Sequence, residues 1–486
     1  MALERIVTPP VKIGVFGIGL HAYWEQLPGL KERLEGYQRE VEDGLRAAGA
    51  EVVSAGLVDT PPTAREAGER FRREDVDLVV CYVGTYATSS QVVPVVRDVG
   101  RPVLVLNLQP TPALDYEEAD TAEWLANCTV CVIPELAGVS TRYGILFNVV
   151  SGLLRTEAGP AGERAWREIG EWVAAASAVR VLRTGRLGFL GHTYPGMMDL
   201  YSDFTLIGGT TGLHVELLEI DDLQARVDDV GDDEIARHTE EARALFDIPA
   251  DASDPERRAP RPDEMAWAAR VAAGLDTLRH DFALDALAYY YRGLGGNDAE
   301  QLGSGMILGN TLLTGRGIPC AGEGDAMTAI AMLIMDRLGA GGSFTEFAAM
   351  DFVDDFLLMG HDGPFHLAIA DGKPILRGKD IFHGKRGGGV AVEARVKTGP
   401  VTILTLTQTA DGRLKLLTAE GESLPGPVLR IGNTFSRIAF SLPPAEFINA
   451  WCRHGPTHHC ALGVGHVAGT AEKVGRLLGI DVVRVG

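Results

Sequence analysis

Five short apolar segments, separated by stretches that favour helix, decide the fold of the first third of the chain. They are VKIGVFG (11–17), EVVSAG (51–56), DVDLVVCYVG (75–84), RPVLVLNL (101–108) and TVCVIPEL (129–136). Apolar strands that alternate with helices are typical of a parallel sheet covered on both faces. The sequence therefore predicts an α/β domain over residues 1-175, whose ligands would sit at the carboxyl ends of the strands.

In the remaining two thirds of the chain, the spacing of the apolar residues changes once. Segments such as RLGFLGHTYPGMMDL (186–200) and HVELLEI (214–220) predict a second α/β domain over 176-354. From about residue 355 the apolar residues recur with a period of two, with a hairpin expected around Asp371 and Gly372 and alternating strands over 390–422. The predicted fold is thus α/β: two consecutive parallel-sheet, Rossmann-like or flavodoxin-like domains, followed by a β-rich, antiparallel, barrel-like domain over 355-486.

Composition and charge exclude several classes of function. The 486 residues include 45 lysines and arginines against 66 aspartates and glutamates, so the net charge of −21 has the wrong sign for a nucleic-acid partner. No apolar run approaches the roughly 18 to 20 residues of a membrane-spanning helix, and the first residues do not resemble a secretory signal. We expect a cytoplasmic protein. Its six cysteines are too sparse for a disulfide scaffold, and Cys128 and Cys131 are expected to be buried structural thiols.

The first strand runs into Gly17-x-Gly19-x-x-Ala22, a nominal dinucleotide fingerprint. That fingerprint needs an acidic residue about 20 residues further on, whereas the candidate, Asp59, lies much later in the chain. An NAD-dependent oxidoreductase is therefore only the weaker alternative.

The same turn carries side chains that suit a polyhydroxylated ligand. Aromatic faces cover C–H patches, while amide and imidazole groups bind hydroxyls. The candidate sugar contacts are His21, Tyr23, Trp24 and Gln26, with Asn107 and Gln109 at the end of a later strand. A loop whose aromatic residues merely cap the core is an equally good interpretation of the first four.

Histidines gather near the C-terminus. Seven of the twelve lie beyond residue 360, mixed with carboxylates in turn-like surroundings. Imidazole and carboxylate oxygen without thiolate suit manganese, iron, cobalt or zinc, with preference for the harder ions.

Three blocks resemble the L-arabinose isomerase pattern, within the wider L-arabinose and L-fucose isomerase group. They are CAGEGDAMTAIAMLIMDRLGAGGSFTEF (320–347), FHGKRGGG (382–389) and GPTHHCALG (455–463). The resemblance implies that Glu346 is a metal ligand and an acid/base group, and that His383 and His459 are metal ligands. It also implies that His458 and the HTYPGMMD segment with Met197 and Met198 meet the substrate.

One position departs from that pattern. A gapless match of DFLLMGHDGPFHLAIA (355–370) puts Pro364 where the family has a second catalytic glutamate. The nearest substitutes are Asp362, as ligand or acid/base group, and His361, with His366 less favoured. Glu323 and Asp325 are interpreted first as capping acids at a helix start, and Asp351 is a reserve metal ligand.

The resemblance implies a metal-dependent aldose–ketose isomerase that acts on a free sugar through an enediol. The sugar would be an L-arabinose-like pentose or a related hexose, and the cofactor Mn²⁺, with Co²⁺, Fe²⁺ or Zn²⁺ as alternatives. It also implies a homo-oligomer, a hexamer or tetramer, with sites near subunit interfaces. The alternative from another class is a non-catalytic, cytoplasmic sugar-binding or regulatory protein on the same scaffold.

Overall fold

The computed structural model describes residues 3–6, 9–249, 258–292, 297–380 and 389–486. The chain divides into two compact units. The N-terminal unit spans Thr8–Arg180, and the main unit combines Met1–Val7 with Val181–Gly486. Among the described helices, none combines the length and apolar composition that a membrane crossing requires.

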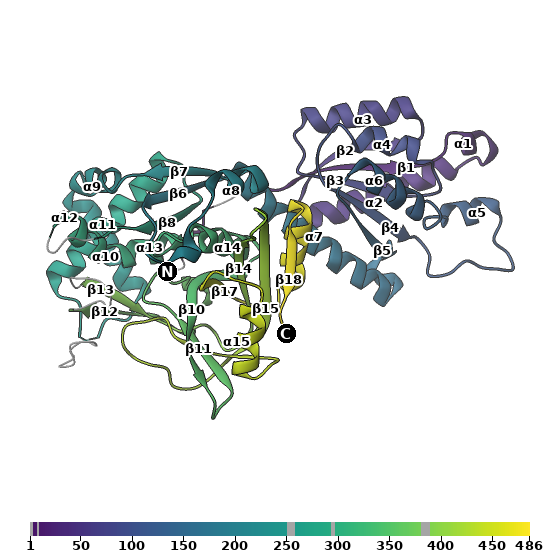
Figure 1. Cartoon of the computed structure of the whole chain (residues 1–486). Coiled ribbons are helices and arrows are strands. Elements are labelled where there is room, and N and C mark those ends of the chain that lie inside the picture. The colour runs from purple at the N-terminus through teal and green to yellow at the C-terminus, as the bar shows by residue number, and fades with distance from the viewer. Residues whose placement is uncertain (1–2, 7–8, 250–257, 293–296, 381–388) are drawn as a thin grey trace. The chain divides into compact units, whose positions relative to one another are not determined.

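The N-terminal unit is a five-stranded parallel sheet with helices around it (Figure 1). Its strands are β1 (Lys12–Ile18), β2 (Glu51–Val58), β3 (Leu78–Val83), β4 (Val103–Gln109) and β5 (Phe147–Leu153). Its helices are α1 (Ala22–Gln26), α2 (Leu30–Ala47), α3 (Pro61–Arg73), α4 (Val93–Val96), α5 (Thr121–Ala126), α6 (Ile133–Tyr143) and α7 (Pro160–Thr184), with short 3₁₀ turns at Ser89–Gln91 and Thr156–Ala158. The strand order β2-β1-β3-β4-β5 is the flavodoxin-like order, as expected.

The segment TVCVIPEL is not a strand, contrary to expectation. Its second half begins helix α6. Pro134 lies in the first turn of that helix, which is the part of a helix that tolerates proline best. The strand that completes the sheet is β5, further along the chain. The interpretation of Cys128 and Cys131 as buried thiols is also wrong, because Cys131 is exposed and Cys128 only half-buried.

The main unit begins with a second parallel sheet, in the order β7-β6-β8-β9. Its strands are β6 (Arg186–Gly191), β7 (His214–Leu218), β8 (Ala286–Tyr290) and β9 (Cys320–Ala321). Its helices are α8 (Phe204–Thr211), α9 (Ile220–Asp228), α10 (Asp232–Leu245), α11 (Pro262–Asp281), α12 (Asp298–Ser304), α13 (Met306–Gly315) and α14 (Ala326–Arg337), with a 3₁₀ turn at Met198–Leu200. This sheet is the predicted second α/β layer.

An antiparallel barrel follows, and it confirms the β-rich C-terminal part. Its strands are β10 (Gly341–Asp351), β11 (Phe356–Gly360), β14 (Gly399–Gln408), β15 (Leu414–Leu424), β16 (Ser436–Phe440) and β17 (His459–Val464). They follow the order β14-β17-β10-β11-β16-β15, and the pairing of β14 with β15 closes the barrel. The remaining elements are α15 (Pro444–Cys452), α16 (Ala468–Leu478) and β18 (Asp481–Arg484), which pairs in parallel with β15.

Two details of the barrel differ from the sequence interpretation. The first barrel strand starts at Gly341, earlier than residue 355, because the glycine-rich break after α14 leads directly into β10. The hairpin expected around Asp371 is wrong: a 3₁₀ turn, Leu367–Ile369, precedes that residue. Strand β12 (Ile375–Lys379) pairs instead with β13 (Gly389–Glu393).

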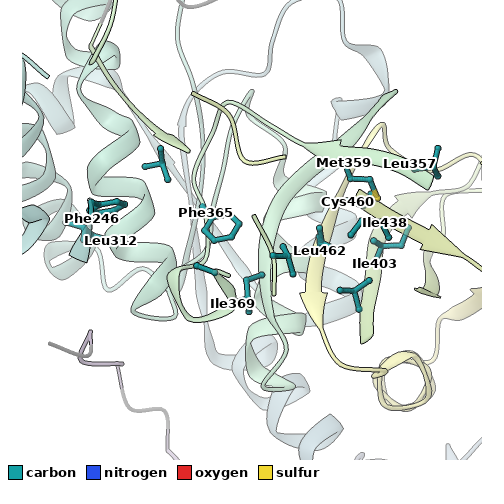
Figure 2. Close-up of a cluster of buried hydrophobic side chains, with 14 of the residues drawn as sticks. Phe246, Leu312, Leu357, Met359, Phe365, Ile369, Ile403, Ile438, Cys460 and Leu462 are labelled. Atoms are coloured by element: carbon teal, nitrogen blue, oxygen red, sulfur yellow. The ribbon is translucent and has the colours of Figure 1, made fainter. Parts of the chain in front are cut away.

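One hydrophobic core joins the parallel layer to the barrel (Figure 2). Phe246 at the end of α10 and Leu312 of α13 belong to the same buried cluster as Met359 of β11 and Ile403 of β14. Because these side chains share a core, the parallel sheet and the barrel form a single unit in which their loops can face each other.

Candidate functional site

The register of three barrel strands places the candidate metal ligands together. On the central strand β10, Glu346 lies opposite His459 of β17 and opposite Gly360, the residue before His361, at the end of β11. Residues directly opposite on antiparallel strands have neighbouring side chains. One ligand atom from each of Glu346, His361 and His459 lies within 4.8 Å of the others. We call these three residues the barrel triad.

Phe344 packs beneath the two imidazoles of the triad. It precedes Glu346 by two positions on β10 and therefore shares its face of the strand. Its ring centroid lies 4.3 Å from that of His459 and 4.7 Å from that of His361. Phe344 is fully buried, so both imidazoles pack against an apolar ring.

Asp325 orients His459 from the other sheet. It precedes helix α14, and its Oδ1 accepts a hydrogen bond from the Thr328 backbone N–H at 2.8 Å, which is the capping role expected from the sequence. Its Oδ2 lies 3.0 Å from His459 Nδ1, and both side chains are fully buried. Burial lowers the pKa of His459 despite the opposing effect of Asp325, so the ring is neutral and Asp325 accepts from Nδ1–H.

The other ring nitrogen of His459 is buried and available to an ion. His459 Nε2 makes no hydrogen bond to any residue that the structure describes. A buried polar atom without a partner is costly, and an imidazole whose other nitrogen donates to a carboxylate is the usual arrangement of a metal ligand. Together with the triad geometry, this fits the donor set of a divalent cation.

A second cluster adjoins the triad through the same histidine. Glu323 Oε2 lies 3.4 Å from His459 Nε2 and 3.8 Å from His458 Nε2. His458 Nδ1 lies 2.7 Å from Asp199 Oδ2. Burial alone would lower the pKa of His458, but hydrogen bonds with Glu323 and Asp199 outweigh it and raise the pKa to about 9. At neutral pH His458 is therefore a cation between two carboxylates.

A pocket opens beside both clusters at the carboxyl end of β8. Its walls include Glu323, His361 and Asp362, together with the consecutive tyrosines Tyr289, Tyr290 and Tyr291. Burial raises the pKa of Tyr290 to about 12, so its phenol keeps its proton and can donate a hydrogen bond. These tyrosines are not among the residues predicted from the sequence, although three adjacent phenols at the end of a parallel strand are a recognisable signal.

The remaining candidates of the main unit have different surroundings. His361 Nδ1 lies 3.0 Å from Asp362 Oδ1, whereas His366 is buried against Asp336, away from the pocket lining. The exposed Asp351 caps a turn through the backbone N–H groups of Val353 and Asp354.

Four further predicted positions complete the comparison. Met197 is half-buried in the turn that carries Asp199, and Met198 is 74% exposed. Pro364, where the gapless match to the L-arabinose isomerase pattern expects a glutamate, is buried. His383 lies outside the described residues.

The sugar contacts expected in the N-terminal unit lie around the end of β1 and β4. Trp24 Nε1 donates to Asp59 Oδ2 at 2.7 Å, and the ring packs so closely on Gly19 that a Cβ there would lie 2.7 Å from it. Packing of Trp24 therefore explains a glycine of the nominal dinucleotide fingerprint. His21 and Gln26 are exposed and Tyr23 is half-buried.

Two amide side chains at the end of β4 already donate hydrogen bonds within the protein. Asn107 donates to Ser151 Oγ at 2.9 Å, and Gln109 donates to the Thr111 carbonyl at 2.6 Å. The Asn107 Oδ1 atom is buried and makes no hydrogen bond to any residue that the structure describes.

Curated proteins of known name resemble this chain over most of its length. An L-arabinose isomerase of Nocardioides sp. (strain ATCC BAA-499 / JS614) is 25% identical over 411 residues, 82% of this chain and 78% of that protein. A second L-arabinose isomerase, from Clavibacter sepedonicus, is 22% identical over 90% of this chain and 85% of that protein. The chain is arabinose isomerase-like. A sulfoquinovose isomerase of Alkalicoccus urumqiensis is 23% identical over 70% of the chain and 75% of that protein.

Two other comparisons add nothing to this assignment. No family model matches the chain. Among solved structures, a carbohydrate transporter from Acidothermus cellulolyticus 11B in complex with myo-inositol has a TM-score of only 0.15 at 12% identity, covering 65% of this chain and 74% of that chain.

Proposed function

We propose that this arabinose isomerase-like protein is a metal-dependent aldose–ketose isomerase. The observation that carries the proposal is the barrel triad, in which the consecutive strands β10 and β11 and the distant strand β17 bring a carboxylate and two imidazoles within 4.8 Å. The relatives named L-arabinose isomerase and sulfoquinovose isomerase support the reaction class. The substrate would be an L-arabinose-like pentose or a related hexose.

The triad residues would hold a divalent cation. Two imidazoles and one carboxylate suit Mn²⁺, Co²⁺, Fe²⁺ or Zn²⁺, and we favour Mn²⁺. When bound, such an ion stabilises negative charge on two neighbouring oxygens of an open-chain sugar. His383 remains a proposed ligand outside the described residues.

The protein's own groups would then move the protons. Glu346 takes the proton from C2 of the aldose and returns it to C1, which needs a carboxylate within a few ångströms of both carbons. Asp362, held against His361, transfers the hydroxyl proton between the two sugar oxygens. The neutral phenol of Tyr290 donates to a substrate hydroxyl at the pocket wall.

The same proposal includes assembly and location. We propose that the protein acts in the cytoplasm as a homo-oligomer, a hexamer or tetramer, with its sites near subunit interfaces. The resemblance to the isomerase family supports this part of the proposal.

Glu346→Gln tests the reaction directly. The amide keeps the size of the side chain but cannot accept the C2 proton, so turnover should fall by about a hundredfold or more while the fold persists. The assay incubates manganese-loaded protein with a panel of aldoses in deuterated water and follows deuterium in the ketose. The matched control is Glu446→Gln on the exposed side of α15.

The outcomes separate the enzyme from a sugar-binding protein. Stoichiometric manganese and deuterated ketose from the unmodified protein would support isomerisation. A purified chain that binds sugar but holds no divalent metal would contradict it, and full activity in Glu346→Gln would remove that residue from the mechanism.

A further inference from the structure

We propose that Cys128 and Cys131 form a reversible redox site in the N-terminal unit. A small-molecule disulfide of the glutathione type converts the two thiols to a disulfide, and the reduced form of that molecule returns them to thiols. This inference does not use the proposed metal site, which belongs to the main unit. It therefore goes beyond the proposed function and can fail without affecting it.

The sulfur atoms of the two cysteines are in contact. Cys128 Sγ lies 2.6 Å from Cys131 Sγ, which is closer than unbonded heavy atoms normally pack. Both residues are free cysteines. Because a disulfide bond has a length of about 2.05 Å, only a small further approach separates the two thiols from a bond.

The backbone holds the two thiols together. At the end of α5, the Cys128 N–H donates to the Leu125 carbonyl at 3.2 Å. At the start of α6, the Ile133 N–H donates to the Val130 carbonyl at 3.1 Å. A turn that is fixed at both ends loses little conformational freedom when its thiols are joined, so the bond can form within the existing structure.

The two cysteines differ in exposure, and this difference sets the order of the reaction. Cys131 is exposed, whereas Cys128 is half-buried. Burial and the hydrogen bond with Cys131 raise the pKa of Cys128 to about 12, so Cys128 keeps its proton while both thiols are free. Cys131 is therefore the sulfur that attacks an external disulfide, and Cys128 is the sulfur that resolves the intermediate.

The exchange with oxidised glutathione balances in atoms and electrons. The Cys131 thiol loses a proton and attacks one sulfur of oxidised glutathione, which forms a mixed disulfide and releases one glutathione thiolate that takes up a proton. Cys128 then loses its proton, attacks Cys131 Sγ and releases the second glutathione. The two cysteines are oxidised by two electrons, and one glutathione disulfide is reduced to two thiols.

A zinc site and a structural disulfide explain this pair less well. A structural zinc ion needs four ligands, and among the described residues no histidine, aspartate or glutamate forms a three-ligand group with these thiols. A bond across two intervening residues closes a very short loop, which constrains the unfolded chain little. Two contacting thiols of which one is exposed are instead typical of a redox-active pair.

The pair lies beside the turn that carries predicted sugar contacts. Burial, followed by the nearby thiols of Cys128 and Cys131, raises the pKa of the Tyr23 phenol. In the loop after β3, the charge of Glu135, then burial and the Cys131 thiol, raise the pKa of Tyr86. A disulfide removes both ionisable thiols, so the redox state of the pair changes the electrostatic surroundings of Tyr23.

Oxidation of the full-length protein tests the inference. The protein is reduced, freed of reductant and equilibrated with glutathione buffers of increasing oxidised fraction, and its free thiols are then alkylated and mapped by mass spectrometry. Cys452 is an internal control, because it is also exposed but the next cysteine along the chain, Cys460, is buried. We expect a bond between Cys128 and Cys131 without attached glutathione, at an oxidised fraction about tenfold lower than the one that attaches glutathione to Cys452.

Three results would overturn the inference. If Cys128 and Cys131 stay reduced while Cys452 is modified, the pair is not a redox site. If glutathione stays attached to Cys131 beside a free Cys128, the pair cannot close. If excess reduced glutathione does not break the bond, the pair is a structural disulfide.

Single substitutions test the order of attack. Cys128→Ser lacks the resolving thiol, so glutathione should remain attached to Cys131. In Cys131→Ser, the remaining half-buried Cys128 should react with oxidised glutathione about tenfold more slowly than Cys131 does in Cys128→Ser. The control Cys452→Ser should leave the pair unchanged. Equal rates in the first two variants would overturn the assignment of Cys131 as the attacking sulfur.

Discussion

Single residues of this site combine roles that the sequence shows only one at a time. Asp325 matches the pattern of a helix cap, and one of its oxygens is a cap. Its other oxygen faces a histidine 134 positions later, which local sequence cannot reveal. The resemblance indicated Glu346 and His459. Only the fold shows that His361 lies beside them and that the Glu323 side chain extends toward His458 and His459.

The two roles of Asp325 can be separated by substitution. Asparagine is also a good N-cap, so Asp325→Asn should lose little stability but weaken manganese binding about tenfold, because the charged acceptor for His459 is gone. Asp325→Ala should lose the same affinity and, in addition, about 1 kcal/mol of stability with the cap. Denaturant unfolding of the metal-free protein and metal titration measure the two effects. Equal manganese affinity in all three proteins would contradict the positioning role.

At the scale of elements, the register of the barrel strands brings the candidate ligands together. The alternating pattern after residue 390 predicted strands, and β14 and β15 pair as antiparallel neighbours there. It could not predict that β10 lies between β11 and β17, because pairing between distant strands is set by the whole barrel. TVCVIPEL was wrongly predicted as a strand. A short apolar run with a proline fits the first turn of a helix as well as it fits a strand.

Helix α14 is anchored at its C-terminal end by a buried ionic network. Asp336, in its last turn, accepts from Arg5 at 2.7 Å and pairs with His366 at 2.9 Å. Burial would raise the pKa of Asp336, but these partners and Arg337 lower it to about 2. A carboxylate at this end opposes the helix dipole, so the network must offset that cost.

This network predicts how stability depends on pH. The lowered pKa means that ionised Asp336 stabilises the fold above about pH 4, and that this contribution, roughly 2 kcal/mol, is lost as the pH falls through about 2. Asp336→Asn should therefore be less stable than the unmodified protein at pH 7, with the difference shrinking toward pH 2. Urea unfolding of the metal-free proteins at several pH values measures it. A difference that stays constant over this range would show that the charge of Asp336 is not responsible.

The whole molecule divides into two compact units. The order of strands and helices allowed both parallel sheets and the barrel to be predicted, because each has its own periodicity. The way they group was harder to foresee. A shared core that includes Phe246 and Ile403 unites the second sheet with the barrel, and such contacts leave no mark on local sequence.

The N-terminal unit should fold by itself. Its parallel sheet has its own buried core, which includes Phe16, Phe71 and Val105, and its size suffices for a stable domain. A fragment of residues 8–184, which keeps α7 whole, should unfold cooperatively in urea and bind no manganese, because the barrel triad belongs to the main unit. A gradual, non-cooperative transition would mean that the N-terminal unit needs the rest of the chain, and manganese binding by the fragment would place a site outside the barrel.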